Sequence, residues 1–340
     1  MALGADARAA TLPGMNPECT ITVRSSADLI AVTPYLLGFH PTDSVVVIGT
    51  AGPVVSFVAR HDLLRPDDDG DDSIAPLVAA QEVEAVTILG YGRPGPVGRT
   101  VETLAAGLTR SGVPIREKLR ITDGRWWRFG CTDSACCPPS GNPVPTHGSV
   151  AAAAVYQGQV ALPSREALIA QVAAVEGELR ARTSAATTRI CRRYALLFSV
   201  NPHPELVLLR AGRLLVIKAE TTYASGRSLT AEEIAHLGVV LTSPVVLDEA
   251  INRTRDEPWR IALWTEVTRG VDPFWVPGPA CLLSHAAWRQ GLGALARVAI
   301  DRALRQDPGH RMACTLDRLL AAGISHDTVA DLAPPRSVTR

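Results

Sequence analysis

The sequence predicts an α/β protein: an N-terminal α/β layered domain with a mixed sheet, followed by a mainly helical C-terminal part. Up to residue 131, short apolar strands alternate with helices, which is typical of layered α/β domains. After residue 148, most segments have the spacing of helices instead. Hydrophobic residues make up 46% of the 340 residues, so the chain can bury a substantial core.

The first ordered segment combines a strand and a helix. The run "ITVR" at 21–24 predicts the strand, and apolar residues at helical spacing predict a helix from the region of Asp28 to Leu37. Gly38 follows the last apolar residue and ends this helix. Pro34 lies inside it, and we expect it to kink or divide the helix.

The next segments predict a hairpin, a helix and a buried strand. Apolar runs at 45–49 and 54–60 flank the letters "TAGP", which is typical of two antiparallel strands joined by a turn. A helix follows at about 74–82. The run "EAVTILGYG" has no helical period and reads as a buried strand.

A second helix and two strands complete the N-terminal domain. The helix starts near Gly98, and Gly112 closes it. The runs "IREKLRI" and "GRWWRFGC" alternate as exposed or edge strands do, and Asp123-Gly124 supplies a tight turn between them.

The C-terminal part predicts helices almost throughout. Ser164 is a fair N-cap for "SREALIAQ", and two further helices cover 294–306 and 311–322. The run "ELVLLRAGRLLVIKAETTYA" is ambiguous, because a hairpin around Gly212 competes with a long helix, which its length and leucine spacing favour.

These elements give four segments along the chain: a flexible tail at 1–19, the α/β domain at 20–148, the helical domain at 149–332 and a flexible tail at 333–340.

Composition excludes several classes of function. Lys and Arg number 34, as do Asp and Glu, so the chain lacks the net positive charge on which non-specific nucleic-acid binding depends. The longest uncharged apolar stretch, 45–59, is too short and too broken to span a bilayer, and the N-terminus has no signal-peptide core. We expect a cytoplasmic protein with no nucleic-acid or membrane partner, whose seven cysteines form no disulfide framework.

Three of the seven cysteines lie within "CTDSACCPP": Cys131, Cys136 and Cys137. Their spacing is not the C-x2-C of zinc ribbons, and three interpretations stay open: a turn with buried thiols, a metal site, or a redox or nucleophilic thiol. Zinc would need a fourth ligand, for which His147 and Asp133 are candidates. Neighbouring cysteines are expected to diverge on an extended backbone, which counts against their joint ligation of one ion.

Cations near these thiols bear on the third interpretation. Arg125 and Arg128 precede the cysteines and could lower the pKa of a thiol. Arg128 is also a candidate ligand-binding residue.

The loop "GFHPTDS" contains the other candidate ligand-binding residues, His40, Asp43 and Ser44. Residues this close in sequence rarely converge as a catalytic triad. Loops at strand ends nevertheless line ligand pockets in α/β proteins, so His40 is a candidate pocket residue. The alternative is a local turn held by Asp43 or Ser44.

The letters "GYGRPG" at 90–95 form a G-x-G-x-x-G pattern between a strand and a helix. Pro94 and Pro96 flank the last glycine and remove two amides that would bind a pyrophosphate. We therefore expect a Gly/Pro turn and no bound nucleotide.

Several of these stretches together resemble a known family. "DLIAVTPYLLGFHPTDSVVVIG", "GRWWRFGCTDSACCPPSGNPV" and "AWRQGLGALARVAIDRALRQDPGHRMACTLDRLLAAGI" are similar to the actinobacterial domain-of-unknown-function family 4192, over about residues 20 to 330. The family has no assigned activity. The resemblance implies three motifs, which contain Gly38, His40, Pro41 and Ser44, then Cys131, Cys136, Cys137 and Pro138, and then Arg165.

Two hypotheses about function follow. The first is a binding or scaffold protein that contacts a protein partner through its helical half, since no catalytic motif is complete. The second is an enzyme or a redox or zinc site, formed where the "GFHP" loop meets the cysteine loop. There, Arg128 or Arg165 would hold a small anionic molecule.

Overall fold

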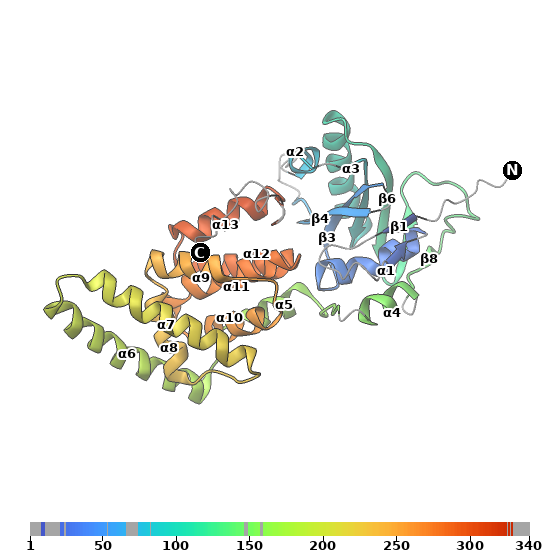
Figure 1. Ribbon diagram of the computed structural model, residues 1–340. Coiled ribbons are helices and arrows are strands. Elements are labelled where there is room, and N and C mark those ends of the chain that lie inside the picture. Colours follow the sequence, from blue (N-terminus) through green and yellow to red (C-terminus); the bar gives the residue numbers. More distant parts are fainter. Residues whose placement is uncertain are drawn as a thin grey trace. The chain divides into compact units, whose positions relative to one another are not determined.

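Two compact units make up the chain, residues 1–167 and 168–340 (Figure 1). The predicted boundary at 148/149 falls before the helix α4 (Ser149–Tyr156), which packs on elements of the first unit. The computed structural model describes residues 8–10, 21–23, 25–52, 54–65, 74–81, 83–145, 149–156, 159–324, 326 and 328.

A mixed sheet forms the centre of the first unit. Among the described residues it has six strands in the order β4-β3-β5-β6-β7-β8, in which β5 and β6 are parallel and the other neighbours antiparallel. This confirms the predicted mixed sheet. The strands are β3 (Ser44–Ala51), β4 (Val54–Asp62), β5 (Ala85–Tyr91), β6 (Ile115–Thr122), β7 (Arg125–Arg128) and β8 (Asn142–Pro143). A separate pair consists of β1 (Arg8–Ala10) and β2 (Ile21–Val23).

Two short turns set the register of this sheet. The hairpin predicted across "TAGP" is present as β3 and β4. Asp123 and Gly124 both have positive φ, 50° and 70°, as a two-residue hairpin turn between β6 and β7 requires. The predicted turn at this position is confirmed.

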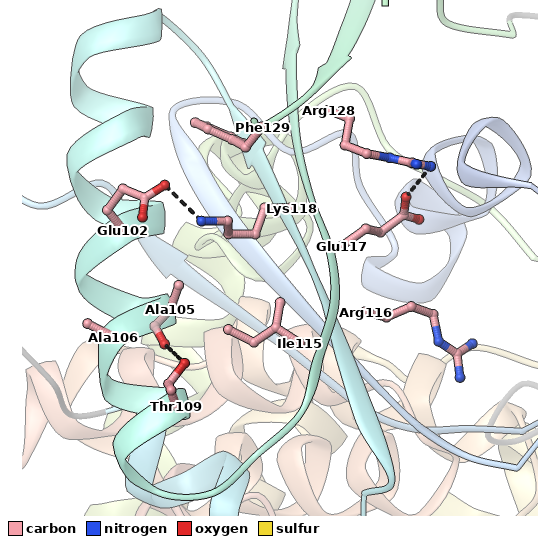
Figure 2. Close-up of a pocket in the computed structure, with 10 residues that line it drawn as sticks. All are labelled: Glu102, Ala105, Ala106, Thr109, Ile115, Arg116, Glu117, Lys118, Arg128 and Phe129. Carbon is pink, nitrogen blue, oxygen red and sulfur yellow. Dashed lines mark hydrogen bonds and ion pairs between the residues drawn. The ribbon is translucent and has the colours of Figure 1, made fainter. Parts of the chain in front are cut away.

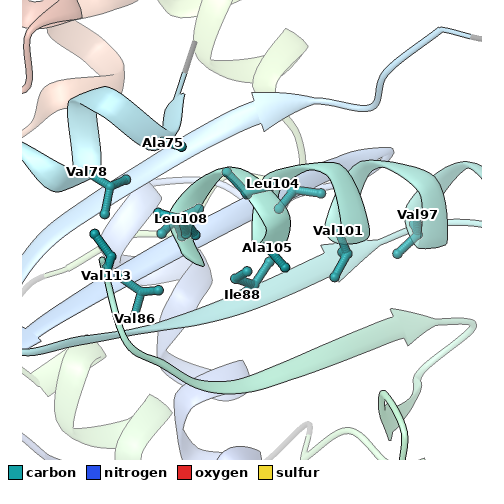
Figure 3. Close-up of a cluster of buried hydrophobic side chains, with 12 residues drawn as sticks. Ala75, Val78, Val86, Ile88, Val97, Val101, Leu104, Ala105, Leu108 and Val113 are labelled. Carbon is teal, nitrogen blue, oxygen red and sulfur yellow. The ribbon is translucent and has the colours of Figure 1, made fainter. Parts of the chain in front are cut away.

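The helix α3 (Pro94–Arg110) covers one face of the sheet, and the hydrophobic core of the unit lies between them (Figure 3). Val97, Val101, Leu104 and Leu108 lie at helical spacing and pack with residues of β3, β5 and the helix α2 (Ile74–Ala79). The contact is close: a Cβ on Gly90 of β5 would lie 2.3 Å from Val97 Cγ1.

The predicted start of α3 near Gly98 was wrong. The helix starts at Pro94 instead. Proline lacks an amide hydrogen, but amides in the first turn of a helix have no intrahelical partner, so no hydrogen bond is lost. The helix α1 (Ser26–Leu37) ends as predicted, with Gly38 at φ 78°, but Pro34 does not divide it. A Ser25 cap that accepts a hydrogen bond from the Asp28 amide (3.1 Å) starts this helix.

The second unit is helical. Its central helix is α11, in which every residue from Pro277 to Trp288 is buried, and α10, α12, α13 and α9 pack around it. The elements are α6 (Gly177–Val200), α7 (Pro204–Ala224), α8 (Ala231–Val240), α9 (Pro244–Arg253), α10 (Trp259–Gly270), the 3-10 helix η1 (Pro273–Trp275), α11 (Pro277–Arg289), α12 (Gly293–Gln306) and α13 (Arg311–Ala321). The helix α5 (Arg165–Val172) spans the division between the units.

The ambiguous run at 205–224 is a single helix, α7, as its length and leucine spacing favoured. Gly212 is not a hairpin turn. A Cβ there would lie 2.6 Å from Val246 Cγ1, so glycine permits close contact between α7 and α9.

A buried ion network joins α7, α9 and α10. Glu220 is 7% exposed, and its two carboxylate oxygens accept from Arg253 (Nη2, 2.5 Å) and Arg260 (Nη1, 2.6 Å). Arg260, also 7% exposed, pairs further with Glu257 at 2.6 Å. Every charge in this core network therefore has an opposite partner.

No single described helix is both long and apolar enough to cross a membrane, although α8 and α9 together reach that threshold with a bend of 112° between them.

Candidate functional site

The three cysteines of the first unit converge. The Sγ atoms of Cys131, Cys136 and Cys137 all lie within 4.8 Å of one another, and those of Cys136 and Cys137 are 3.9 Å apart. Cys136 is exposed and the other two are half-buried. We call this group the thiol cluster.

A turn at Asp133 brings the neighbouring cysteines together. The Asp133 carbonyl oxygen accepts hydrogen bonds from the amides of Cys136 (3.2 Å) and Cys137 (2.7 Å), and its Oδ1 accepts from the Ala135 amide (2.8 Å). The backbone is therefore coiled and not extended at this point. The expectation that the side chains of Cys136 and Cys137 diverge was wrong for this reason.

The edge of the sheet braces the loop from outside. Asn142 Nδ2 donates to the Cys136 carbonyl (2.8 Å), and Trp127 Nε1 donates to the Pro139 carbonyl (3.4 Å). Gly141 has φ 74°, and a Cβ on it would lie 2.4 Å from Trp127 Cζ2, so this position requires glycine. The thiol cluster is thus attached to β7 and β8 rather than carried on an unsupported loop.

The thiols titrate as a group. A backbone hydrogen bond at Asp133 lowers the pKa of Cys131, and a hydrogen bond with Cys137 adds to the effect. The neighbouring Cys131 and Cys137 raise the pKa of Cys136 to about 11. The first proton therefore leaves most readily from Cys131, whose thiolate then accepts hydrogen bonds from its neighbours.

The two arginines expected near the thiols are engaged elsewhere. Arg128 Nη2 donates to Glu117 Oε2 (3.0 Å) and to Ser26 Oγ (3.3 Å). Arg125 Nη1 donates to the Gly141 carbonyl (2.9 Å) and so supports the loop. The lowered pKa of Cys131 thus comes from hydrogen bonds of the loop itself, not from these cations.

A hollow of about 660 Å³ lies between α3, β6 and the end of β7 (Figure 2). Glu102 pairs with Lys118 (2.9 Å) and Glu117 with Arg128 (3.0 Å), so the hollow offers few unpaired charges to a ligand. Its lining residues are Glu102, Ala105, Ala106, Thr109, Ile115, Arg116, Glu117, Lys118, Arg128 and Phe129.

The other candidate loop leads into β3. Ser44 is buried as the first residue of that strand, whereas His40 and Asp43 are exposed. The His40 amide donates to the Leu162 carbonyl (2.9 Å), which fixes the backbone of this loop. Asp43 packs against the next turn, since its Oδ1 lies 2.7 Å from the Cβ position of Gly92.

The sheet order separates this loop from the thiol cluster. Two strands, β5 and β6, lie between β3 and β7. At about 4.8 Å per strand, the two loops leave strands that are roughly 14 Å apart. This arrangement gives no support to a single site shared by His40 and the cysteines.

Arg165 lies toward the opposite edge of the sheet. Ser164 caps α5 as predicted, by accepting from the Ala167 amide (3.3 Å). A hydrogen bond from Ser164, with the nearby charges of Arg165 and of Arg60 on β4, lowers the pKa of Glu166. Arg165 and Arg60 of β4 thus act on the same carboxylate, that of Glu166.

The glycines of "GYGRPG" have packing explanations. Gly90 admits Val97, and Gly92, at φ 126°, admits Asp43. Pro94 and Pro96 lie in the first turn of α3 and supply no amide there. The interpretation as a Gly/Pro turn therefore accounts for the pattern.

Sequence reasoning missed the residues that build the thiol cluster. Asp133, Gly141 and Asn142 position the thiols, yet none was a candidate beyond Asp133 as a ligand. The letters "TDSA" and "SGN" are turn signals, and these could have indicated that the loop folds back on itself. His147, the other proposed ligand, lies outside the described residues.

Comparison with known proteins gives one result. No curated protein and no solved structure matches the chain significantly. The model of the domain of unknown function DUF4192 matches residues 27–326, which cover both units and most of the chain. The protein is therefore a member of the DUF4192 family.

Proposed function

We propose that this is a binding protein whose thiol cluster holds a thiophilic metal ion of the zinc class. The observation that carries the proposal is the convergence of three Sγ atoms within 4.8 Å. Zn–S bonds of about 2.3 Å at tetrahedral angles place two sulfurs roughly 3.8 Å apart. The 3.9 Å between the Sγ atoms of Cys136 and Cys137 meets this requirement.

Exposure of the thiols favours a ligand over a packing role. A cysteine that only fills space behaves as a small apolar residue and is buried, as Cys281 of α11 is. Cys136 is exposed instead, and three thiols face one another across a surface loop. A cation would relieve the repulsion that opposes ionisation of all three thiols.

Three protein ligands leave the fourth position of a tetrahedral ion open. Asp133 is a poor fourth ligand, because its Oδ1 already accepts from the Ala135 amide at 2.8 Å. Water, a substrate or a group of a partner could then complete the coordination, as in zinc sites that bind or activate a ligand. We place the protein in an actinobacterial cytoplasm, where thiols stay reduced and available to a metal.

The test is the metal content of protein purified under reducing, chelator-free conditions. We expect about one zinc per chain in the wild type. Cys131→Ser, Cys136→Ser and Cys137→Ser should each lose most of it, while Cys191→Ser, a half-buried cysteine of α6, should keep it. Replacement with Co²⁺ should give a thiolate-to-cobalt absorption band that the first three variants lack.

Two results would contradict the metal proposal. One is a protein that neither retains zinc nor binds added Co²⁺ through its thiols. The other is equal metal binding by Cys136→Ser and the wild type. Fast alkylation of a single thiol without metal would favour the alternative, a redox or nucleophilic thiol.

A second candidate function is partner binding through the helical unit, and exposed apolar residues favour it. Leu196, Val200 and Leu214 are 71%, 80% and 71% exposed on α6 and α7. Arg192 and Arg193 flank the first two and have no ion-pair partner among the described residues. Exposed apolar residues beside two cations at the end of α6 suit an acidic amphipathic helix of a protein partner.

A model peptide can test this second function. A helical peptide with leucine on one face and glutamate beside it should bind the wild type in a fluorescence anisotropy titration. Leu196→Glu should weaken binding roughly tenfold or more, because it removes apolar area and adds a like charge. Leu292→Glu changes a 44% exposed leucine elsewhere in the unit and should have no effect. Equal binding by both variants would contradict the proposal.

A further inference from the structure

A buried arginine in the helical unit lacks a counter-charge. Arg302 lies on α12 and is 8% exposed. Its Nη1 is inaccessible to solvent and has no hydrogen-bond partner among the described residues. A buried, unpaired guanidinium is unfavourable, because the protein replaces neither the water nor the counter-ion that it loses.

The same unit also contains a buried arginine whose charge is fully paired. Arg260 is equally buried, yet Glu220 and Glu257 each accept a hydrogen bond from it at 2.6 Å. This helical core therefore supplies carboxylates where it buries a guanidinium for structural reasons. At Arg302 it supplies none within the described residues.

Other arginines gather around Arg302 instead. Burial, together with the nearby charges of Arg305, Arg180 and Arg269, lowers the pKa of Arg302 to about 10. These residues come from three helices, since Arg180 is on α6, Arg269 on α10, and Arg305 on α12 with Arg302 itself. Arg305 is thus a neighbour of Arg302 on the same helix, whereas Arg180 and Arg269 come from other helices.

Backbone contacts fix these neighbours in place. Arg180 Nη1 donates to the Val271 carbonyl (2.5 Å), and its Nη2 pairs with Asp272 at 3.1 Å. Arg269 Nε donates to the Ala173 carbonyl (3.1 Å), and Arg305 Nε donates to the Asp301 carbonyl (3.1 Å). The Nη groups of Arg269 and Arg305 keep their donors free among the described residues.

The donors and the net charge define what would fit. Of these four guanidiniums, only that of Arg180 has an ion pair among the described residues, with Asp272, which leaves a net charge of about three positive units. Guanidinium forks from several directions match a tetrahedral oxyanion better than a planar carboxylate, which has two acceptor atoms. A phosphate dianion offers both the charge and the number of acceptors.

We propose that Arg302, together with Arg180, Arg269 and Arg305, forms a binding site for a phosphate group between α6, α10 and α12 of the helical unit. Arg302 is the buried member of this group, and Arg305 is its exposed member. The site is independent of the thiol cluster, because every one of its residues belongs to the second unit.

Calorimetric titration of the full-length protein with inorganic phosphate, at constant ionic strength, tests this. We expect saturable binding by the wild type and a rise in Tm of several degrees over chloride. Arg302→Met should weaken phosphate binding by roughly tenfold or more, because the charge-assisted hydrogen bonds of the innermost group are lost. Arg311→Met, an exposed arginine at the start of α13, should bind phosphate as the wild type does.

Arg269→Met and Arg305→Met provide a second pair of variants if Arg302→Met does not fold. Both residues are more exposed than Arg302, and each substitution should weaken phosphate binding at least several-fold. An equal effect of phosphate and chloride on Tm would overturn the proposal. So would undiminished phosphate binding by these variants.

A phosphomonoester distinguishes the two sources of the group. If glycerol phosphate binds at least as tightly as inorganic phosphate, the ligand is a phosphorylated small molecule whose terminal group reaches Arg302. If inorganic phosphate binds and the ester does not, the occupant is the free ion. Either result supports the site, and loss in Arg302→Met must accompany it.

Discussion

Two buried arginines of the helical unit show how differently one fold treats the same charge. Arg260 lies in a complete network with Glu220 and Glu257, whereas Arg302 faces three further arginines and has a free Nη1. In the first arrangement every charge has an opposite partner within the fold, and the ion pairs join α7, α9 and α10. The second leaves a buried donor without a partner among the described residues, and we propose that a ligand supplies it.

The thiol cluster belongs with Arg302 in this comparison. Once one thiol of the cluster has ionised, its charge opposes ionisation of the next, as the raised pKa of Cys136 indicates, just as neighbouring guanidiniums oppose each other's charge. Opposite ions would resolve the two cases, a cation among the thiols and an anion among the arginines. Places where like groups converge are thus more informative about function than places where opposite charges pair.

The largest effect should come from breaking the complete network. Glu220→Ala removes the partner of two arginines and leaves Arg260 with Glu257 alone. Breaking a buried pair costs about 3–5 kcal/mol, and the remaining Glu257 places this variant near 3 kcal/mol. Urea denaturation measures the loss of unfolding free energy.

Glu232→Ala is the control for this prediction. It breaks an exposed pair with Arg189, in which the side chains are 62% and 58% exposed, and should cost less than about 1 kcal/mol. Equal losses of unfolding free energy for the two variants would show that the buried network stabilises the fold no more than an exposed ion pair does.

Arg302→Met should have the opposite sign. In phosphate-free buffer it removes an unpaired buried charge and fills the same space with an apolar side chain. We expect a gain in unfolding free energy at the lower end of about 1–4 kcal/mol, from the same urea measurement. A loss of stability would mean that Arg302 is already satisfied within the fold, and the comparison with Arg260 would fail.

A smaller effect is expected from the support of the thiol cluster. Gly141→Ala adds a Cβ where Trp127 lies 2.4 Å away, at a φ of 74°. Gly130→Ala has nearly the same φ, 72°, but no atom within 4 Å of its Cβ position. Both should lose about 1–2 kcal/mol to backbone strain, and Gly141→Ala somewhat more. Only Gly141→Ala should also reduce metal retention, and equal retention would contradict the bracing role of Trp127.

The last prediction concerns the order in which the thiols of metal-free protein ionise. Alkylation follows the thiolate fraction, so Cys131, with its lowered pKa, should react first as the pH rises. Cys136 should react after Cys131 and reach half its maximal rate near pH 11. Mass spectrometry of alkylated peptides over a pH series gives this order. Simultaneous reaction of both residues would show that the cluster does not form in solution.

Local patterns were sufficient for much of the fold. The apolar run at 45–49 predicted a strand, which is the buried β3, and Asp123-Gly124 predicted the turn that joins β6 and β7. The run that became α7 stayed ambiguous, because Gly212 is a turn signal in sequence and a packing contact with Val246 in the fold. A single sequence cannot distinguish these two roles of glycine.

The sites were harder to predict, because they depend on geometry that residue spacing does not express. The cysteine positions were candidates from the start, but their convergence depends on the turn at Asp133. Arg302 was not a candidate, since two of its neighbours, Arg180 and Arg269, come from helices far away in sequence. Likewise, the sheet order, which sequence did not predict, separates His40 from the cysteines.

The loop that carries the thiols also determines where the sheet stops. Its last residues form β8, a strand of only Asn142 and Pro143, paired with β7. A short outer strand with a proline has few amides to offer to another chain, so it blocks edge-to-edge growth of sheets between molecules. If oxidation of the thiols unfolded this loop, β7 would become an open edge, and the damage would appear first as self-association.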